Sequence, residues 1–298
     1  MRENVLTDYK AAGPDKKYSK TLRQVKKYTG TVILWIIMLL LTVMVLYPLL
    51  FVFTTSFKTY GEFLANTFSI SFAHPENYAQ AWIDGHFSTY FFNSVLVTGL
   101  TVIAKVFMSG LVAYCIAVLK IKGWKIVTAI VMSTMFFTGE ITGIPQFLLA
   151  RELNLLDTIW ALIVPGLLGP AGLGVLLGMG YAKKIPKELH EAALLDGAGI
   201  FAIFWRIDLV LMIPMLTFVA IQTFTATWSD FFWPLITITT NESAKTLPLG
   251  LINFQSQNNS NYGVLCAGLC IMTVPIILLY CFLSKYFIEG VAAGAVKG

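Results

Sequence analysis

Residues 31–53 of this 298-residue chain read TVILWIIMLLLTVMVLYPLLFVF. They lie within 30 consecutive uncharged residues between Lys27 and Lys58, and a helix needs only about 20 apolar residues to cross a bilayer. The stretch is too long for the apolar region of a signal peptide, and no small-residue cleavage site follows it. We therefore expect a retained membrane span, which places the chain among all-α membrane proteins.

The composition of the whole chain indicates the same class. Apolar residues make up 57% of the sequence and charged residues 12%, whereas ordinary soluble domains have roughly 45–50% and 25%. The mean hydropathy is +0.73. All four cysteines fall in apolar stretches, where they are expected to pack as small side chains without forming disulfides or metal sites. These values exclude a soluble fold, a disordered chain and a disulfide scaffold.

Six apolar stretches are long enough to be transmembrane helices. The predicted spans are residues 30–53, 90–119, 126–150, 158–182, 209–229 and 263–284. An even number of spans places both termini on one side of the membrane. Of the 21 Lys and Arg residues, 17 lie in the tails and loops of that side and three lie in the opposite loops. Because basic loops stay in the cytoplasm, the sequence predicts an N-in/C-in topology, with a basic tail at 1–29 and a transmembrane domain at 30–298.

Helix-breaking residues fall inside two of these spans. Pro48 lies in the first span, and Pro165, Gly169, Pro170 and Gly172 lie in the fourth. A broken helix at membrane depth is tolerated where protein or a water-filled cavity covers the freed backbone groups. The pattern favours a transport pathway over a simple anchor, and a packing kink is the alternative for each single residue.

The sequence has no pattern typical of an enzyme. His190 and Glu191 begin like the H-E-x-x-H of zinc proteases, but position 194 is Leu194. The other histidines, His74 and His86, are predicted on the outer side, so we expect no metal site. No phosphate-binding G-x-x-x-x-G-K-[ST] occurs. Any energy from ATP must therefore come from another subunit.

The loop between the fourth and fifth spans, residues 183–209, reads KKIPKELHEAALLDGAGIFAIFWRIDL. Pro186 suits the first position of a short helix, because its missing N–H is not needed there. Gly197 and Gly199 then allow the chain to turn. A partly apolar face with Glu191 at its rim suits docking in a groove of a cytosolic partner. A helix that lies in the membrane interface and contacts only lipid is the alternative.

At this loop the chain resembles the permease subunits of bacterial ABC importers. Their signature is E-A-A, three residues, G, nine residues and I-x-L-P. The chain has E-A-A at 191–193, Gly197, and I-x-L at 207–209. Val210 replaces the proline, and Pro214 follows four residues later. The resemblance is therefore close, with a shifted bend after the loop.

More specifically, the chain is similar to the second permease of the maltose-type carbohydrate importers. Four further stretches carry this likeness: Pro48 with TTSFK at 54–58, FNS at 92–94, TWSDFFWPL at 227–235 and the tail GVAAGAVKG at 290–298. The resemblance implies the type I ABC importer fold, with six transmembrane helices in the bacterial cytoplasmic membrane. It implies a non-catalytic subunit that moves a sugar or oligosaccharide into the cytoplasm.

The resemblance also implies partners. These are a homologous second permease, two cytosolic ATPase subunits that bind ATP and Mg²⁺, and an extracytoplasmic sugar-binding protein that contacts the outer loop at 236–262. The chain itself would hold no cofactor. The short loop helix would be the coupling helix in the ATPase cleft, carried by Leu189, Glu191, Ala192, Ala193, Asp196 and Gly197. An ion-coupled secondary transporter and an intramembrane hydrolase are the alternatives from other classes.

Two charged residues lie within predicted spans. Lys105 in the second and Glu140 in the third are expected at similar depth, and because charges in a bilayer usually pair, they predict an intramembrane ion pair. The pair would belong to the translocation path or act as a packing device. Polar and aromatic residues of the fifth span are candidates for the sugar route: Gln222, Thr225, Trp228 and Asp230. Interfacial anchoring is the alternative for the tryptophan and the aspartate.

Overall fold

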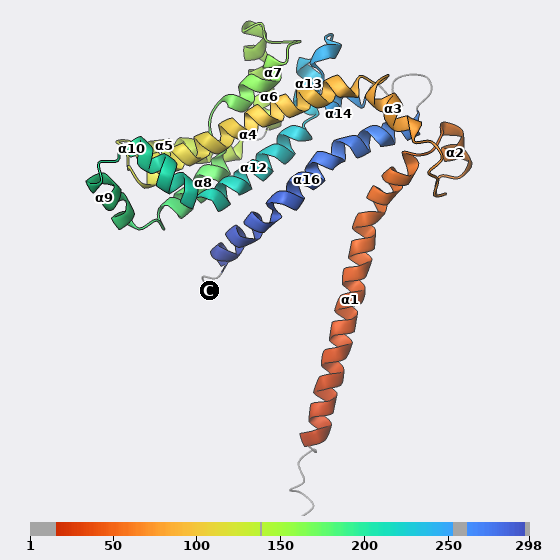
Figure 1. Cartoon of the computed structure of the whole chain (residues 1–298), viewed down its shortest axis with the longest axis horizontal. Helices are drawn as coiled ribbons and strands as arrows, with labels where there is room; N and C mark the ends of the chain where they lie inside the picture. The colour runs from red at the N-terminus through yellow and green to blue at the C-terminus, as the bar shows by residue number, and fades with distance from the viewer. Residues whose placement is uncertain (1–15, 138, 253–260, 296–298) are drawn as a thin grey trace, which may run out of the picture. The chain divides into compact units, whose positions relative to one another are not determined.

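The computed structural model describes residues 16–137, 139–252 and 261–295, without the side chains of 16–27, 140 and 284–295. The described part of the chain is built of helices and loops and contains no strand. It forms two units, residues 1–54 and 55–298 (Figure 1). Each unit is described by itself.

The first unit is dominated by the single long helix α1 (Lys16–Thr55). Its segment Tyr28–Thr55 has a mean hydropathy of 2.8, and its side chains are exposed from residue 28 to residue 50. The hydroxyl of Thr42 donates a hydrogen bond to the carbonyl of Met38 one turn earlier, at 2.8 Å. Satisfaction of polar groups within the helix is what a lipid environment requires. The first predicted span is therefore a helix of the right length and composition to cross a bilayer.

Three further segments are helical and apolar over a length that can cross a membrane. They are α4 (Phe87–Ala117), the segment Trp160–Ala182, and Tyr262–Leu283 within α16 (Tyr262–Ala295). The segment Trp160–Ala182 consists of α7 (Trp160–Leu167) and α8 (Gly172–Ala182), with an irregular turn between them. The break predicted in the fourth span is thus present in the structure.

Two more apolar segments are sharply bent helix pairs. Helices α5 (Trp124–Ser133) and η2 (Thr134–Phe136) meet α6 (Gly139–Glu152) at 104°. Helices α10 (Ile200–Ile203), η3 (Phe204–Asp208) and α11 (Leu209–Leu211) form an elbow that meets α12 (Ile213–Trp228) at 76°. The described chain therefore has four membrane-length helices, or six spans if each bent pair is one span. The hydropathy of the sequence predicts spans at both segments, but it does not predict the bends.

Helix α4 lies at the centre of the second unit, between α8 and α12. The contact between α8 and its neighbours depends on two glycines one turn apart. A Cβ added to Gly174 would lie 2.6 Å from Val219, and one added to Gly178 would lie 2.6 Å from Ala113. Small residues at this spacing allow close approach of membrane helices. One buried cluster therefore lies where α4, α8 and α12 meet, and Val131 of α5 joins it.

The short helices of the second unit lie at its two ends. Helices α2 (Tyr60–Ala65), α3 (Glu76–Trp82) and α14 (Leu247–Gly250) lie at one end, and α9 (Lys187–Leu195) and α10 lie at the opposite end (Figure 1). Helices α13 (Phe232–Thr237) and η4 (Glu242–Ala244) complete the connection between α12 and α14. The loop before α2 and the loop that contains α9 therefore serve opposite ends of the bundle.

Candidate functional site

A cavity of about 660 Å³ opens among the helices α4, η2, α6, α7, α8, α12 and α13. Most of its polar lining consists of hydroxyl and amide side chains, with one lysine, one aspartate and two aromatic rings. These residues are Thr101, Thr134, Thr223, Thr227, Gln146, Gln222, Lys105, Asp230, Phe232 and Trp233. A concave site with a few polar groups among apolar ones is typical of a small-molecule site.

One wall of the cavity is the break between α7 and α8. Gly169 has φ +73°, a left-handed conformation that glycine adopts readily. Lys105 Nζ on α4 donates a hydrogen bond to the carbonyl of Leu168 at 3.1 Å. One turn along α4, the Ser109 hydroxyl accepts a hydrogen bond from the backbone N–H of Ala171 at 2.9 Å. Two side chains of α4 therefore satisfy backbone groups that the break leaves without helical partners.

Lys105 has a hydrogen-bond partner that the sequence did not predict. Its described hydrogen bond goes to the backbone of the broken span. The side chain of Glu140 lies outside the described residues, so the ion pair between them stays a prediction.

The structure separates the four residues predicted for the sugar route. Gln222 and Asp230 line the cavity, and Thr225 and Trp228 do not. The Thr225 hydroxyl donates to the carbonyl of Ile221 at 2.9 Å. Trp228 is buried in the contact with α16, where its Nε1 donates to the carbonyl of Met272 at 2.9 Å. Trp228 is thus a core residue rather than an interfacial anchor.

Several lining residues were missed by sequence reasoning. On α12 the signal was helical periodicity, because residues 222, 223, 226 and 227 fall on one face. Thr101 and Gln146 come from other helices, and no local pattern pointed to them. The Thr101 hydroxyl is buried without a hydrogen-bond partner among the described residues. A buried polar atom at a cavity wall is a group that a ligand or water can satisfy.

At the opposite end from the outer loops, α9 has the limits that the sequence predicts. Pro186 directly precedes its first residue, and Gly197 after its end has φ +78°. The backbone N–H of Ala198 donates to the carbonyl of Ala193 at 2.9 Å, as in a glycine-terminated helix. No residue of α9 is buried, and Leu195 is 90% exposed. The helix therefore presents an unpartnered surface.

The predicted coupling residues belong to this surface in different degrees. Leu189, Glu191, Ala192, Asp196 and Gly197 are exposed, and Ala193 is half-buried. His190 turns toward the bundle instead, with its Nε2 at 2.9 Å from Oδ1 of Asp208. Among the described residues no group of three or more His, Cys, Asp or Glu side chains is placed to hold a metal ion.

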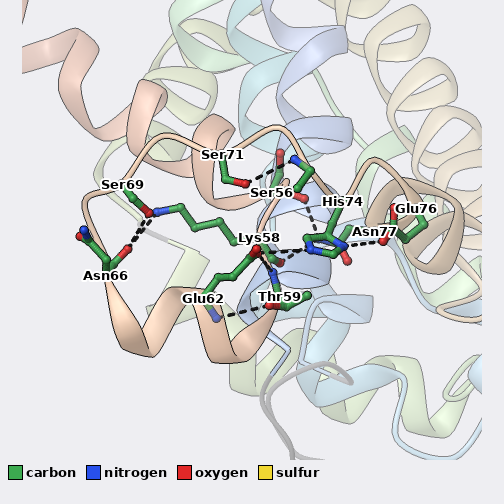
Figure 2. A network of polar contacts seen from close by, with 11 residues as sticks. Ser56, Lys58, Thr59, Glu62, Asn66, Ser69, Ser71, His74, Glu76 and Asn77 are labelled. Atoms are coloured by element: carbon green, nitrogen blue, oxygen red, sulfur yellow. Dashed lines mark hydrogen bonds and ion pairs between the residues drawn. The ribbon is translucent and has the colours of Figure 1, made fainter.

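The loop after α1 is organised by a buried lysine (Figure 2). Lys58 is fully buried, and its Nζ donates to the carbonyl of Thr67 at 2.8 Å. The Asn77 amide donates to the carbonyls of Ser56 and Lys58 at 2.9 and 3.0 Å. A Cβ added to Gly263 would clash with the carbonyl oxygen of Lys58. The start of α16 therefore packs directly on this turn. These contacts give a structural reason for the T-T-S-F-K stretch.

His74 lies between two carboxylates in the same loop (Figure 2). Its Nδ1 is 2.6 Å from Glu76 Oε1, and its Nε2 is 3.4 Å from Glu62 Oε2. The hydrogen bond to Glu76 is the main cause that raises the pKa of His74 above its usual value. Glu62 also caps α2 by accepting the backbone N–H of Thr59, which lowers the pKa of Glu62. Hydrogen bonds to two carboxylates therefore hold this loop.

A second connection is held by Asp157, which has φ +59°. Its carboxylate accepts hydrogen bonds from the backbone N–H groups of Thr239 and Thr240 at 2.7 and 2.8 Å, and from that of Asn241 at 3.3 Å. These bonds lower the pKa of Asp157 to about 2. The carboxylate thus joins the turn before α7 to the turn after α13.

No family model matches the chain, but related proteins do. It is 36% identical, over 92% of its length and 91% of the relative, to the probable ABC transporter permease protein YurM of Bacillus subtilis. It is 32% identical, over 92% of its length and all of the relative, to the arabinooligosaccharides transport system permease protein AraQ of Halalkalibacterium halodurans. It is 29% identical, over 87% of its length and 94% of the relative, to the trehalose/maltose transport system permease protein MalG of Thermococcus litoralis.

A solved structure supports the same fold. A bacterial ABC transporter involved in the import of the acidic polysaccharide alginate matches with a TM-score of 0.73 and 23% identity, over 88% of this chain and 98% of that chain.

The apolar helices and the relatives together define a multi-pass membrane protein of the transport class. Within that class, the chain belongs to the family of ABC sugar-transport permeases represented by these relatives. Permease subunits of ABC transporters do not hydrolyse ATP, because the ATPase is a separate subunit. They work with ATPase and binding-protein subunits.

Proposed function

We propose that the chain is one of two permease subunits of an importer in the bacterial cytoplasmic membrane. The importer takes a sugar or oligosaccharide from an extracytoplasmic binding protein and releases it into the cytoplasm. The observation that carries this proposal is the polar cavity beside the broken span, in a chain related along nearly its whole length to sugar permeases. Named relatives handle arabinooligosaccharides, trehalose or maltose, and diacetylchitobiose.

The chemistry of the cavity suits a polyhydroxylated ligand. Thr101, Gln146 and Gln222 offer hydroxyl and amide groups that both donate and accept hydrogen bonds. Phe232 and Trp233 supply aromatic faces for the apolar side of a sugar ring. The Trp233 Nε1 donates to the carbonyl of Ala161 at 2.9 Å, which fixes the ring in the wall. The cavity thus combines hydrogen-bonding groups with fixed rings.

Helix α9 is proposed as the coupling helix. Its exposed leucines can enter a groove of the ATPase, in the manner of an apolar helix that docks in a partner. The residues assigned to this contact are Leu189, Glu191, Ala192, Ala193, Asp196 and Gly197. This assignment places α9 in the cytoplasm, and with each bent pair counted as one span both termini lie there too. The distribution of Lys and Arg supports that orientation.

The remaining subunits follow from the same proposal. They are a homologous second permease, two ATPase subunits that bind ATP and Mg²⁺, and a sugar-binding protein at the outer surface. The outer loop at 236–262 is the proposed contact for the binding protein, and residues 253–260 of it lie outside the described part of the chain. Closure of the ATPase pair would displace α9 and alternate the access of the cavity, with no covalent step in this subunit.

The test is uptake by proteoliposomes that contain the purified complex. ATP is enclosed, and the binding protein and labelled arabinooligosaccharide, maltose or diacetylchitobiose are added outside. We expect uptake that requires ATP and is insensitive to an ionophore. Uptake that needs an ion gradient and no ATP would refute the proposal in favour of a secondary transporter.

Co-purification provides the test of the coupling residues. Gly197→Asp forces a side chain onto a residue with φ +78°, and Glu191→Lys reverses the charge at the rim of α9. Both variants are expected to lose the ATPase subunits or to uncouple them. Glu152→Gln, which removes an exposed carboxylate at the end of α6, is the matched control.

A further inference from the structure

A buried hydrogen bond joins α9 to the elbow that precedes α12. His190 Nε2 lies 2.9 Å from Oδ1 and 3.1 Å from Oδ2 of Asp208. Since a carboxylate only accepts hydrogen bonds, Nε2 of the imidazole donates. The Asp208 side chain is fully buried and the His190 side chain is 14% exposed. A buried carboxylate needs such a partner, because an unpaired one is strongly destabilising.

The elbow that carries Asp208 is fixed to α4 by aromatic contacts. The ring centroids of Phe204 and Tyr114 are 5.2 Å apart, and those of Trp205 and Phe107 are 5.8 Å apart. Asp208 is the last residue of η3, a π-helical turn, and such turns often occur at functional sites. The elbow is therefore a fixed platform, with Asp208 at the end nearest to the bend.

The bend connects this platform to the cavity. The carbonyl of Asp208 accepts the backbone N–H of Met212 at 2.9 Å, and Met212 is the residue at which the elbow meets α12 at 76°. Helix α12 then carries Gln222, Thr223 and Thr227 along the cavity wall. A displacement delivered at Asp208 thus enters the helix that lines the cavity.

We propose that the contact between His190 and Asp208 is a positioning link that carries the movement of α9 into α12. Without this link, α9 is joined to the bundle through the short connections at 183–186 and 196–199, and Gly197 makes the second one easy to rotate. With the link, α9 and the elbow move as one body. The inference rests on the proposed role of α9 as the ATPase contact.

Neither residue belongs to the E-A-A-x-x-x-G pattern. His190 precedes the glutamate, and Asp208 occupies the free position of the I-x-L sequence. The link is therefore a property of this chain beyond the motif.

The test compares His190→Leu, Asp208→Leu and the double variant in the reconstituted complex. Spin labels at residues 146 and 223, on opposite helices of the cavity, report its width by electron–electron distance measurement in a background without native cysteines. ATP with vanadate traps the closed ATPase pair. We expect the distance distribution of the wild type to shift on trapping. In each single variant, the ratio of the shifted to the unshifted population should fall roughly tenfold, as for loss of one charge-assisted hydrogen bond.

The double variant separates transmission of movement from simple stability. Replacing both partners with apolar residues removes the unpaired buried charge, so thermal stability should recover toward the wild-type value. The shifted population should nevertheless stay low, because the link is still absent. If the shift recovers together with stability, the pair is only a packing device and the inference is wrong. The double variant decides this even if a single variant fails to assemble.

His190→Gln is the conservative variant, since its amide N–H can reach the carboxylate, and it should keep most of the shift. Glu152→Gln is the control for loss of a carboxylate elsewhere. A normal shift in His190→Leu would overturn the proposal. If the wild-type complex binds no ATPase or traps no nucleotide, the proposed function itself has failed, which is a different result.

Discussion

The contact of α8 with α4 predicts opposite effects of one substitution at two neighbouring glycines. A Cβ at Gly178 would lie 2.6 Å from the Cβ of Ala113 and 2.6 Å from the Cε of Met215. A Cβ at Gly180, two residues later in the same helix, meets nothing within 4 Å. The methionine can rotate away, but the Cβ of Ala113 is fixed to its backbone. Gly178→Ala therefore requires the two helices to move apart.

The expected magnitudes follow from two terms. Replacing glycine with alanine inside a helix stabilises it by about 1 kcal/mol, and this term applies at both positions. Overpacking a tight contact destabilises by about 1–3 kcal/mol, and this term applies to Gly178 alone. The intrinsic term cancels in the comparison, so Gly178→Ala should be about 1–3 kcal/mol less stable than Gly180→Ala.

The assay is the temperature at which half of the detergent-solubilised protein survives heating, measured by size-exclusion fluorescence on both variants and the wild type. At about 2–4 °C for each kcal/mol, the two variants should differ by several degrees, with Gly180→Ala at or above the wild type. Equal midpoints, or a more stable Gly178→Ala, would refute the close contact of α8 with α4.

Three further predictions concern polar contacts. Ser109→Ala leaves the backbone N–H of Ala171 without its acceptor at the break, and should lower the free energy of unfolding by about 1–3 kcal/mol in the same heating assay. Because the pKa of Asp157 is lowered, its hydrogen bonds to the loop at 239–241 stabilise the fold fully above about pH 4, and this stabilisation is lost as the pH falls toward 2. Amide exchange in that loop should become faster over this pH range, and Asp157→Asn should abolish the pH dependence. Because the pKa of His74 is raised, its bond to Glu76 stabilises the loop fully below pH 6.5, and this stabilisation is lost as the pH rises through the raised pKa. Titration of His74 by NMR should give a pKa above 6.5, and Glu76→Gln should lower that pKa.

The polar contacts described above connect α9 with the cavity along one route. Helix α9 presents its leucines outward and holds the bundle through His190. The elbow at Asp208 leads into α12, and α12 forms a wall of the cavity beside the broken span. Lys105 and Ser109 keep the backbone of that break satisfied. Under the proposed function, this route would carry a movement of the ATPase at α9 into altered access of the cavity.

The local features of this route could be predicted from the sequence. Residues 31–53 are apolar throughout, so they had to be a membrane helix, and the limits of α9 follow from Pro186 and from the left-handed Gly197. The break in the fourth span follows from its proline and glycines. Each of these depends on a few neighbouring residues and their backbone preferences, which the sequence states directly.

The composition of the site depended on tertiary structure. Lys105 finds its partner at Leu168, 63 residues away, and Trp228 is a core residue because α16 covers it. The 104° and 76° bends are invisible to hydropathy, which measures how apolar a segment is and not its direction. Aspartate is usually exposed, and nothing in the sequence around Asp208 indicates otherwise. Only the packing of the elbow on α4 buries Asp208 beside His190. The sequence by itself thus determined the membrane class, the apolar segments and the short loop helix, because these depend on local hydropathy and backbone preference. Tertiary structure alone decided which polar groups meet, because helices distant in the chain must pack before their side chains can find one another.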